Sequence, residues 1–199
     1  MGQTTPGAAG SWWSRLWAPP KRKWLLGIPL GALFAFILGM LVWAAAGATL
    51  HATSTTHFCA YACHEFEAYV TPSWQVSVHH KNAEGVGAGC PDCHLPKPVG
   101  PMLVRKARSV NEIWGHVTGK IDTQEKFDAH KLEMAERVWA YMKETDSREC
   151  RGCHNPEAWD LSAQDPSAQK KHASMKEQGK TCIDCHKGVA HDLPPGAEG

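Results

Sequence analysis

The hydropathy pattern of the chain is dominated by one long uncharged run near the N-terminus. Residues 24–50 carry no charged side chain and read WLLGIPLGALFAFILGMLVWAAAGATL. At a rise of 1.5 Å per residue, such a helix would extend about 40 Å, enough to cross a hydrocarbon core of about 30 Å with some tilt. Residues 24–50 are therefore predicted to form a transmembrane anchor helix.

The flanks of this run indicate its orientation. Residues 1–23 contain Arg15, Lys21, Arg22 and Lys23 and no acidic residue, so they are predicted to be a basic segment on the cytoplasmic side. Everything after about residue 51 is then expected in the periplasm. A cleaved signal peptide is the alternative, because residues 44–48 are small enough for a cleavage site. The apolar run is about twice the length of a signal-peptide core, which favours an uncleaved single-pass anchor in the inner membrane.

Helical periodicity returns only in short stretches beyond the anchor. The longest runs from Asp122 to about Thr145, with Asp122 and Glu125 spaced as a capping box at its start. Shorter helices are predicted over residues 101–118 and 167–178, the latter followed by Gly179 as a C-terminal cap.

A repeated cysteine motif interrupts these stretches and uses all 8 cysteines of the 199-residue chain. Three copies read Cys-x-x-Cys-His, and the first copy is stretched to Cys-x-x-x-Cys-His. This pattern is typical of c-type haem attachment, in which each sulfur forms a thioether to the haem and the histidine binds the iron. The predicted attachment residues are Cys59 and Cys63, Cys90 and Cys93, Cys150 and Cys153, and Cys182 and Cys185, followed by His64, His94, His154 and His186.

The cysteines would otherwise raise the possibility of zinc sites or disulfides. The histidine that directly follows every pair argues for haem instead. Attachment of haem takes place on the periplasmic face, in agreement with the predicted orientation. The net charge of +1 offers no basic surface for nucleic acid, so no nucleic-acid partner is expected.

Four haems would occupy a domain of about 140 residues, which leaves little polypeptide for a conventional core. We therefore expect a mainly α fold with much irregular structure: one N-terminal transmembrane helix plus a compact multihaem c-type cytochrome domain. The motifs divide residues 51–199 into two predicted dihaem halves, about 51–120 and 121–199.

Each iron needs a second axial ligand, and six further histidines lie beyond the first motif. They are His79, His80, His116, His130, His172 and His191. Of these, His130, His172 and His191 are the preferred distal ligands, together with one of the adjacent pair His79 and His80. Ligation by two histidines gives low-potential haems, which suit electron transfer from a quinol towards an anaerobic reductase.

Five segments of the chain carry a resemblance to a known family. Besides the anchor and first motif, they are CPDCHLPKPVGPMLVRK, IDTQEKFDAHKLEMAERVWAYMK, SRECRGCHNPEAWD and TCIDCHKGVAHDLP. With these segments the chain resembles the NapC/NirT family of membrane-anchored tetrahaem quinol dehydrogenases. The resemblance implies four covalent haems, and oxidation of ubiquinol or menaquinol at the haem nearest the membrane. It also implies electron transfer to a periplasmic reductase of the nitrate, nitrite or TMAO type.

The resemblance also implies roles for individual residues. The family's distal ligands map onto His79, His130, His172 and His191, and its acidic quinol-site residue maps onto Asp122. Two positions depart from the family pattern. Phe66 stands where a methionine often binds the first iron, and His116 stands where a lysine commonly accompanies the acidic residue. His116 is expected either to hydrogen-bond a quinol oxygen or to occupy the open side of the first haem.

Two function hypotheses remain at this point. The first is a quinol-oxidising electron-transfer subunit. The second is a membrane-tethered relay that receives electrons from another cytochrome and has no quinol site. The sequence does not identify the reductase. It also leaves the oligomeric state open, and a homo-oligomer is one of the possible states.

Overall fold

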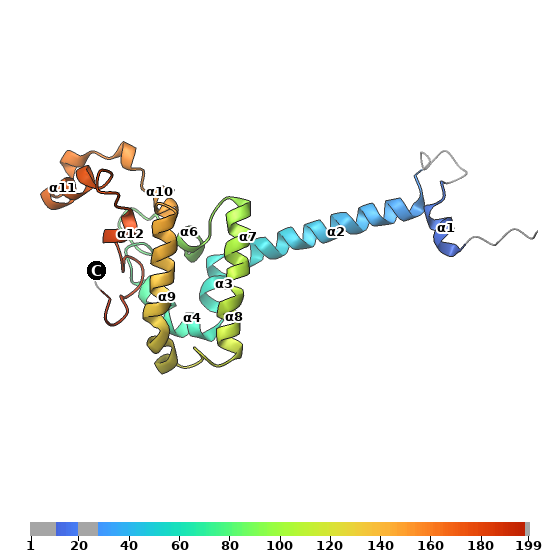
Figure 1. Ribbon diagram of the computed structural model, residues 1–199, viewed down its shortest axis with the longest axis horizontal. Helices are drawn as coiled ribbons and strands as arrows, with labels where there is room; N and C mark the ends of the chain where they lie inside the picture. Colours follow the sequence, from blue (N-terminus) through green and yellow to red (C-terminus); the bar gives the residue numbers. More distant parts are fainter. Residues whose placement is uncertain (1–10, 20–27, 198–199) are drawn as a thin grey trace, which may run out of the picture. The chain divides into compact units, whose positions relative to one another are not determined.

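The computed structural model describes residues 11–19 and 28–197 (Figure 1). These residues form helices, turns and irregular segments, and no β-strand occurs among them. The chain divides into two compact units, Met1–Ala52 and Thr53–Gly199. The mainly α fold expected from the sequence is therefore confirmed.

The first unit contains the candidate membrane anchor. Its helices are α1, Trp12–Trp17, and α2, Leu30–Ala52. Helix α2 has 23 residues and a mean hydropathy of 2.1, and it is the one helix within the described ranges that is long and apolar enough to cross a membrane. The predicted anchor began six residues earlier, but residues 24–27 of that prediction lie outside the described residues. At its other end α2 continues two residues beyond the predicted limit.

The second unit is built from short helices around one long helix. Helix α9, Gln124–Glu144, is the long one and matches the predicted segment closely. The other helices are α3, Thr56–Tyr61; α4, His64–Tyr69; α5, Thr71–Gln75; α6, Cys90–His94; α7, Val99–Arg108; α8, Val110–Val117; α10, Arg148–Arg151; α11, Pro166–Ser174; and α12, Cys182–Cys185. Two single 3-10 turns, Pro156–Ala158 and Leu161–Ala163, precede α11.

The predicted start of α9 is wrong in detail. Thr123, not Asp122, is the N-cap residue, and its hydroxyl accepts a hydrogen bond from the Lys126 backbone N–H at 3.3 Å. Asp122 instead pairs through its carboxylate with Lys126 Nζ at 2.8 Å. A threonine at the cap satisfies one of the unpaired N–H groups of the first turn, which leaves Asp122 free for another role.

Two other predicted helices differ in their bounds. The helix expected over residues 101–118 consists of α7 and α8, which meet at Ser109. The helix expected over residues 167–178 ends as α11 at Ser174, four residues before the predicted end. Gly179 does adopt the left-handed conformation predicted for it, with φ of 60°.

The protein part of the core in the second unit is small. Its buried apolar residues are Ala60, Trp74, Ile121, Phe127, Met142 and Ile183. Such a core is thin for a domain of this length, since a domain of about 150 residues normally buries about two thirds of its unfolded surface. The small core agrees with the expectation that porphyrin rings supply much of the buried apolar surface.

Candidate haem and quinol sites

Two of the four motifs fix their own helices by the same device. In the second motif, Asp92 Oδ2 accepts a hydrogen bond from the Gly89 backbone N–H at 2.8 Å. In the fourth, Asp184 Oδ2 accepts from the Thr181 backbone N–H, also at 2.8 Å. The aspartate inside each Cys-x-Asp-Cys-His motif therefore closes the first turn of α6 or α12 and holds both cysteines on a short helix.

The first and second motifs are packed tightly together at Gly89. A Cβ atom at Gly89 would clash with Thr56 Oγ1, at the start of α3. A side chain at this position would require the Thr56 side chain to move. The glycine before Cys90 therefore allows the close approach of the two motif helices.

Neighbouring motifs lie close enough for their cysteines to influence one another in sequence order. Burial raises the pKa of Cys90 to about 11, and the Cys59 thiol of the first motif adds to the shift. Burial also raises the pKa of Cys93 to about 11, with a further contribution from Cys150 of the third motif. Burial is the main cause that raises the pKa of Cys150, and Cys182 of the fourth motif adds to the shift. The attachment points thus form a continuous series from the first motif to the fourth.

Ser147 joins the third and fourth motifs. It lies just before α10, is fully buried at 0% exposure, and has a left-handed backbone with φ of 48°. Its N–H donates to the Met142 carbonyl at 2.7 Å, and its Oγ accepts from the Ile183 N–H of α12 at 3.2 Å. One residue therefore ties α9, α10 and α12 together.

Each motif histidine lies beside one histidine from elsewhere in the chain. Two imidazoles bound to opposite sides of one iron, each at a metal–nitrogen distance of about 2 Å, have ring centres about 6 Å apart. The ring-centre separations are 6.2 Å for His79 and His154, 6.2 Å for His94 and His191, 5.9 Å for His172 and His186, and 5.5 Å for His64 and His116. Three of the four predicted distal histidines, His79, His172 and His191, are thus placed opposite a motif histidine. Of the adjacent pair in the sequence, the partner of His154 is His79, whereas His80 packs on Trp74 at 4.1 Å.

The orientation of two of these distal histidines is fixed by hydrogen bonds at Nδ1. His79 Nδ1 donates to the Val189 carbonyl at 3.1 Å, and His172 Nδ1 donates to Gln164 Oε1 at 2.7 Å. A hydrogen bond at Nδ1 sets the tautomer and leaves the Nε2 lone pair for a metal. Both residues therefore have the arrangement of ligating histidines.

The pair His94 and His191 is marked by lowered pKa values and by a buried ring nitrogen without a hydrogen-bond partner in the described chain. Burial lowers the pKa of His94 to about 4, and His191 contributes to the shift. Burial also lowers the pKa of His191, whose Nδ1 is buried and has no hydrogen-bond partner among the described residues. Neutral imidazoles are the form that binds metal. The residues at the second, third and fourth motifs thus fit covalent haem with imidazole ligands.

His130 has no such opposite histidine among the residues that the structure describes. Its Nδ1 donates to the Lys126 carbonyl of its own helix at 2.9 Å, which leaves Nε2 unassigned. The structure therefore does not bring His130 together with a motif histidine, although the family pattern maps a ligand onto it. Its place in the ligand set stays a prediction.

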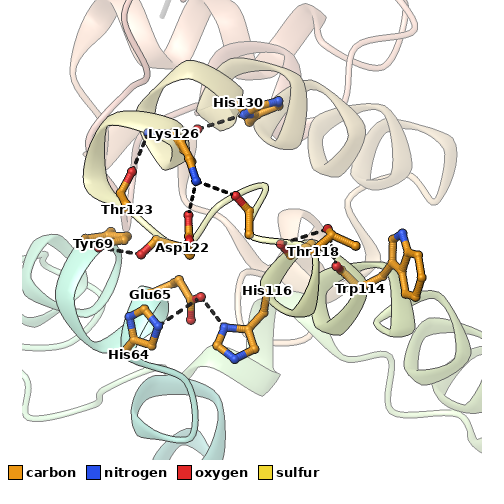
Figure 2. A network of polar contacts seen from close by, with 12 residues as sticks. His64, Glu65, Tyr69, Trp114, His116, Thr118, Asp122, Thr123, Lys126 and His130 are labelled. Atoms are coloured by element: carbon orange, nitrogen blue, oxygen red, sulfur yellow. Dashed lines mark hydrogen bonds and ion pairs between the residues drawn. The ribbon is translucent and has the colours of Figure 1, made fainter.

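The first motif is surrounded by a polar network that includes a residue not predicted from the sequence (Figure 2). Glu65 follows His64 at the start of α4 and is 1% exposed. Its Oε1 lies 2.5 Å from His116 Nδ1 and 3.3 Å from His64 Nε2, whereas its buried Oε2 has no hydrogen-bond partner in the described chain. The three ligand atoms of His64, Glu65 and His116 lie within 4.8 Å of one another. Glu65 is thus the centre of the first-motif site.

Burial by itself would raise the pKa of Glu65, but the hydrogen bond from His116 and the two nearby imidazoles bring it below its usual value. An ionised carboxylate held against an imidazole Nδ1–H is a common way to orient that imidazole. Nothing in the sequence marked Glu65, since an acidic residue after a motif histidine is ordinarily a solvated side chain. Glu65 and His116 are 51 positions apart in the sequence, and the fold brings them into contact.

Asp122 lies in the same region, between α8 and α9 (Figure 2). The hydrogen bond from Lys126 is the main cause that lowers the pKa of Asp122. Lys126 Nζ also donates to the Gly119 carbonyl at 2.9 Å, which fixes the loop that carries Asp122. The loop therefore presents an ionised carboxylate beside the first motif, and its side chain is 39% exposed.

The chain matches the model of the NapC/NirT cytochrome c family, N-terminal region, over residues 21–196. It is 45% identical over 180 residues to the cytochrome c-type protein NapC of Haemophilus influenzae, which covers 90% of this chain and 88% of the relative. It is 42% identical over 177 residues to the denitrification system component NirT of Stutzerimonas stutzeri, with 89% and 87% covered. A relative from Allochromatium vinosum, named as a tetraheme cytochrome-c type, is 42% identical over 174 residues, with 87% and 91% covered. No solved structure matches the chain.

The candidate anchor helix, the four motifs and the family match over residues 21–196 agree on one assignment. The chain belongs to the NapC/NirT cytochrome c family and is a membrane cytochrome c of anaerobic respiratory electron transfer.

Proposed function

We propose that this protein oxidises quinol at the periplasmic surface of the inner membrane and passes the electrons to a periplasmic reductase. The observation that carries the proposal is the polar site of Glu65, His116 and Asp122 at the first of four successive haem motifs (Figure 2). A quinol site at one end of a series of redox centres is the arrangement that the function requires. The anchor helix supplies access to membrane quinol.

The haems, when bound, supply one-electron redox centres at the four motifs. Three of them are proposed to have two histidine ligands each, in the pairs His79 and His154, His94 and His191, and His172 and His186. The protein orients these imidazoles through the hydrogen bonds at His79 and His172 described above. The burial of His94 and His191 keeps both rings neutral.

Oxidation of a quinol releases two electrons and two protons, so the site must accept protons as well as electrons. Asp122 is proposed to accept a hydrogen bond from one quinol hydroxyl and to take its proton. Because Lys126 favours the ionised form of Asp122, the carboxylate is available to a bound quinol near neutral pH. The exposed side of this carboxylate then allows the proton to leave to the periplasm.

His116 is proposed to bind the second quinol oxygen. With Nδ1 held by Glu65, its Nε2 is free to act towards a ligand, and the side chain is 44% exposed. The same orientation would suit a ligand on the open side of the first haem. The absorption and EPR spectra of His116→Ala separate the two roles, since only a ligand role changes the spin state of a haem.

The acceptor is proposed to be a periplasmic reductase, or its cytochrome subunit, in nitrate, nitrite or TMAO respiration. The support is the set of relatives named NapC, NirT and TorY. These names differ from one another, so they support the class of acceptor and not one enzyme.

The test is reduction of the haems by menaquinol or ubiquinol analogues in the detergent-solubilised full chain, followed by absorbance against a dithionite-reduced sample. Asp122→Asn should slow the reduction about 10- to 100-fold at unchanged haem content, as expected for loss of a proton acceptor. Asp128→Asn is the matched control, because Asp128 is an exposed carboxylate in the first part of α9 and accepts a hydrogen bond from the Gln124 side chain. Equal rates in both variants would remove Asp122 from the mechanism.

A tethered electron relay without a quinol site is the second candidate. The observation in its favour is Phe66, which cannot ligate iron and replaces a residue that often does so in the family. In that case neither quinol reduces the protein, whereas a reduced periplasmic cytochrome does.

A further inference from the structure

Helix α11 and the turn that follows it carry exposed lysines next to the histidine that lies opposite the fourth motif. They are Lys170, Lys171, Lys176 and Lys180, and we call them the lysine patch. In the turn, Lys180 N–H donates to the Met175 carbonyl at 2.9 Å, and Gly179 N–H donates to the Lys176 carbonyl at 3.2 Å. These bonds fold the turn back on the end of α11, so the four lysines belong to one compact element.

The positive charge of the lysine patch is not balanced by ion pairs in the described part of the chain. None of its four ammonium groups forms a salt bridge with a described residue. Between Lys170 and Lys187 the acidic residues are Glu177 and Asp184, and Asp184 is already paired with Lys143 at 2.6 Å. The whole chain has a net charge of +1, so this concentration of positive charge is a local feature.

The lysine patch adjoins the proposed ligands of the fourth haem. His172 directly follows Lys170 and Lys171 in α11, and its ring centre is 5.9 Å from that of His186. On the other side of this pair, Lys187 directly follows His186 and adds a fifth lysine. Positive side chains therefore flank both histidines of the pair.

The fourth motif is the last in the series of attachment sites. Cysteines of neighbouring motifs influence one another in sequence order, from the first motif to Cys182 of the fourth. Helix α11 lies at the margin of the second unit and packs mainly on the 3-10 turn Leu161–Ala163 (Figure 1). Electrons that enter at the first motif would thus reach the last haem beside an accessible, positively charged helix.

We propose that the lysine patch is the docking surface for the electron acceptor, and that this acceptor presents an acidic surface around its own redox centre. The inference rests on the proposed function, because it takes the fourth haem as the site where electrons leave. Opposite charges on two partners speed their encounter and orient them, and dissolved salt screens this effect. Anionic lipid headgroups also bind lysines, but the position of the patch at a pair of haem ligands favours a redox partner.

The test starts from the full haem-loaded chain in detergent, reduced with dithionite and freed of excess reductant, so that no quinol reaction is needed. Two oxidised proteins of opposite charge serve as acceptors: plastocyanin, an acidic copper protein, and mitochondrial cytochrome c, a basic haem protein. Stopped-flow absorbance follows the transfer of one electron, in which a ferrous haem becomes ferric and the acceptor's copper(II) or iron(III) becomes copper(I) or iron(II). The rate constant with plastocyanin should fall about tenfold or more between about 10 mM and about 200 mM salt, whereas that with cytochrome c should not fall.

Two double variants locate the charge. Lys170→Glu/Lys180→Glu should lower the plastocyanin rate constant about tenfold at about 10 mM salt and change it little at about 200 mM. Arg108→Glu/Lys120→Glu is the matched control, because it makes the same change in net charge at two exposed residues outside the patch. The control should change the rate constant less than about twofold. Haem content and the low-spin signal are compared in every variant.

Equal rates in the two double variants would overturn the proposal, since net charge alone would then explain the salt dependence. A plastocyanin rate that does not fall with salt would overturn it as well, and would assign the lysines to another anion such as lipid headgroups. If the glutamate variant loses haem, Lys170→Gln/Lys180→Gln decides, because it removes the same two charges without adding an acid beside His172. Failure of quinol to reduce the protein would contradict the proposed function but would leave these rates unaffected.

Discussion

The pairing of His172 with His186 gives the most direct test of the ligand arrangement. The two ring centres are 5.9 Å apart, Gln164 holds His172 Nδ1 at 2.7 Å, and Trp159 packs on the His172 ring at 4.8 Å. His172→Ala removes one axial ligand of one haem. The haem at the fourth motif should become high-spin, so the low-spin signal of one of the three haems proposed to have two histidine ligands should disappear.

Gln164→Ala provides a graded version of the same change. It keeps the imidazole but removes the hydrogen bond at Nδ1. Loss of such an outer contact typically weakens a metal ligand about 10-fold or more, which is about 1.4 kcal/mol. A ligand held by a covalently attached haem should survive this loss, so the fourth haem should stay low-spin. Its reduction potential should shift while that of the others remains constant.

His130→Ala is the contrasting variant. His130 is also a histidine within a helix whose Nδ1 is bonded to an oxygen, but no motif histidine lies opposite it in the described part of the chain. His130 remains a predicted distal ligand, so His130→Ala should convert one low-spin haem to the high-spin form, and an unaltered signal would remove His130 from the ligand set.

The assay is low-temperature EPR of the oxidised full-length protein, with haem content measured by the pyridine haemochrome method. An unaltered spectrum of His172→Ala would refute the pairing. Loss of the low-spin signal of one haem in His130→Ala would show that ring-centre proximity alone does not identify the ligands of this protein.

Three further predictions concern attachment, helix capping and pH. Cys59→Ser should leave one haem with a single thioether, so mass spectrometry should still find four haems while the absorption band of that haem shifts; four doubly linked haems would contradict the assignment of the stretched motif. Thr123→Ala removes the N-cap hydroxyl of α9 and should lower the free energy of unfolding by about 1 kcal/mol, as measured by chemical unfolding. Thr123→Ser keeps the hydroxyl and should lower it little. The hydrogen bond from Lys143 lowers the pKa of Asp184 to about 2, so this aspartate stabilises the fold above its unfolded pKa of about 4, and its contribution is lost as the pH falls from about 4 through about 2. Asp184→Asn should flatten that part of the pH dependence of the unfolding temperature, and an unchanged profile would count against it.

The sequence predicted the features that depend on local patterns. The apolar run, the four motifs and the period of α9 each lie within one continuous segment, so length and spacing were sufficient to find them. The first-motif site could not be predicted in the same way. Glu65 and His116 are 51 positions apart, and only the approach of α4 to α8 gives the carboxylate its partner.

Candidates for the distal ligands could be named from the sequence, but their pairing with the motif histidines could not. A histidine can reach any haem that the fold brings near, as the partners His79 and His154 show. The error at the start of α9 has a local cause. Asp122 and Thr123 are both good cap residues, and Lys126 decides between them because it binds the Asp122 carboxylate.

The hydrogen bonds of Ser147 bear on the rate of electron transfer between the third and fourth attachment sites. The rate at which an electron tunnels between two centres falls exponentially with their separation, so small fluctuations in spacing change it greatly. Ser147 is bonded to both α9 and α12 and directly precedes α10, so the third and fourth attachment sites cannot drift apart without breaking a buried hydrogen bond. A glycine would fit the left-handed backbone with less strain but would lack the oxygen that binds Ile183. With haems attached at the third and fourth motifs, the strained serine would keep the two redox centres at a fixed spacing.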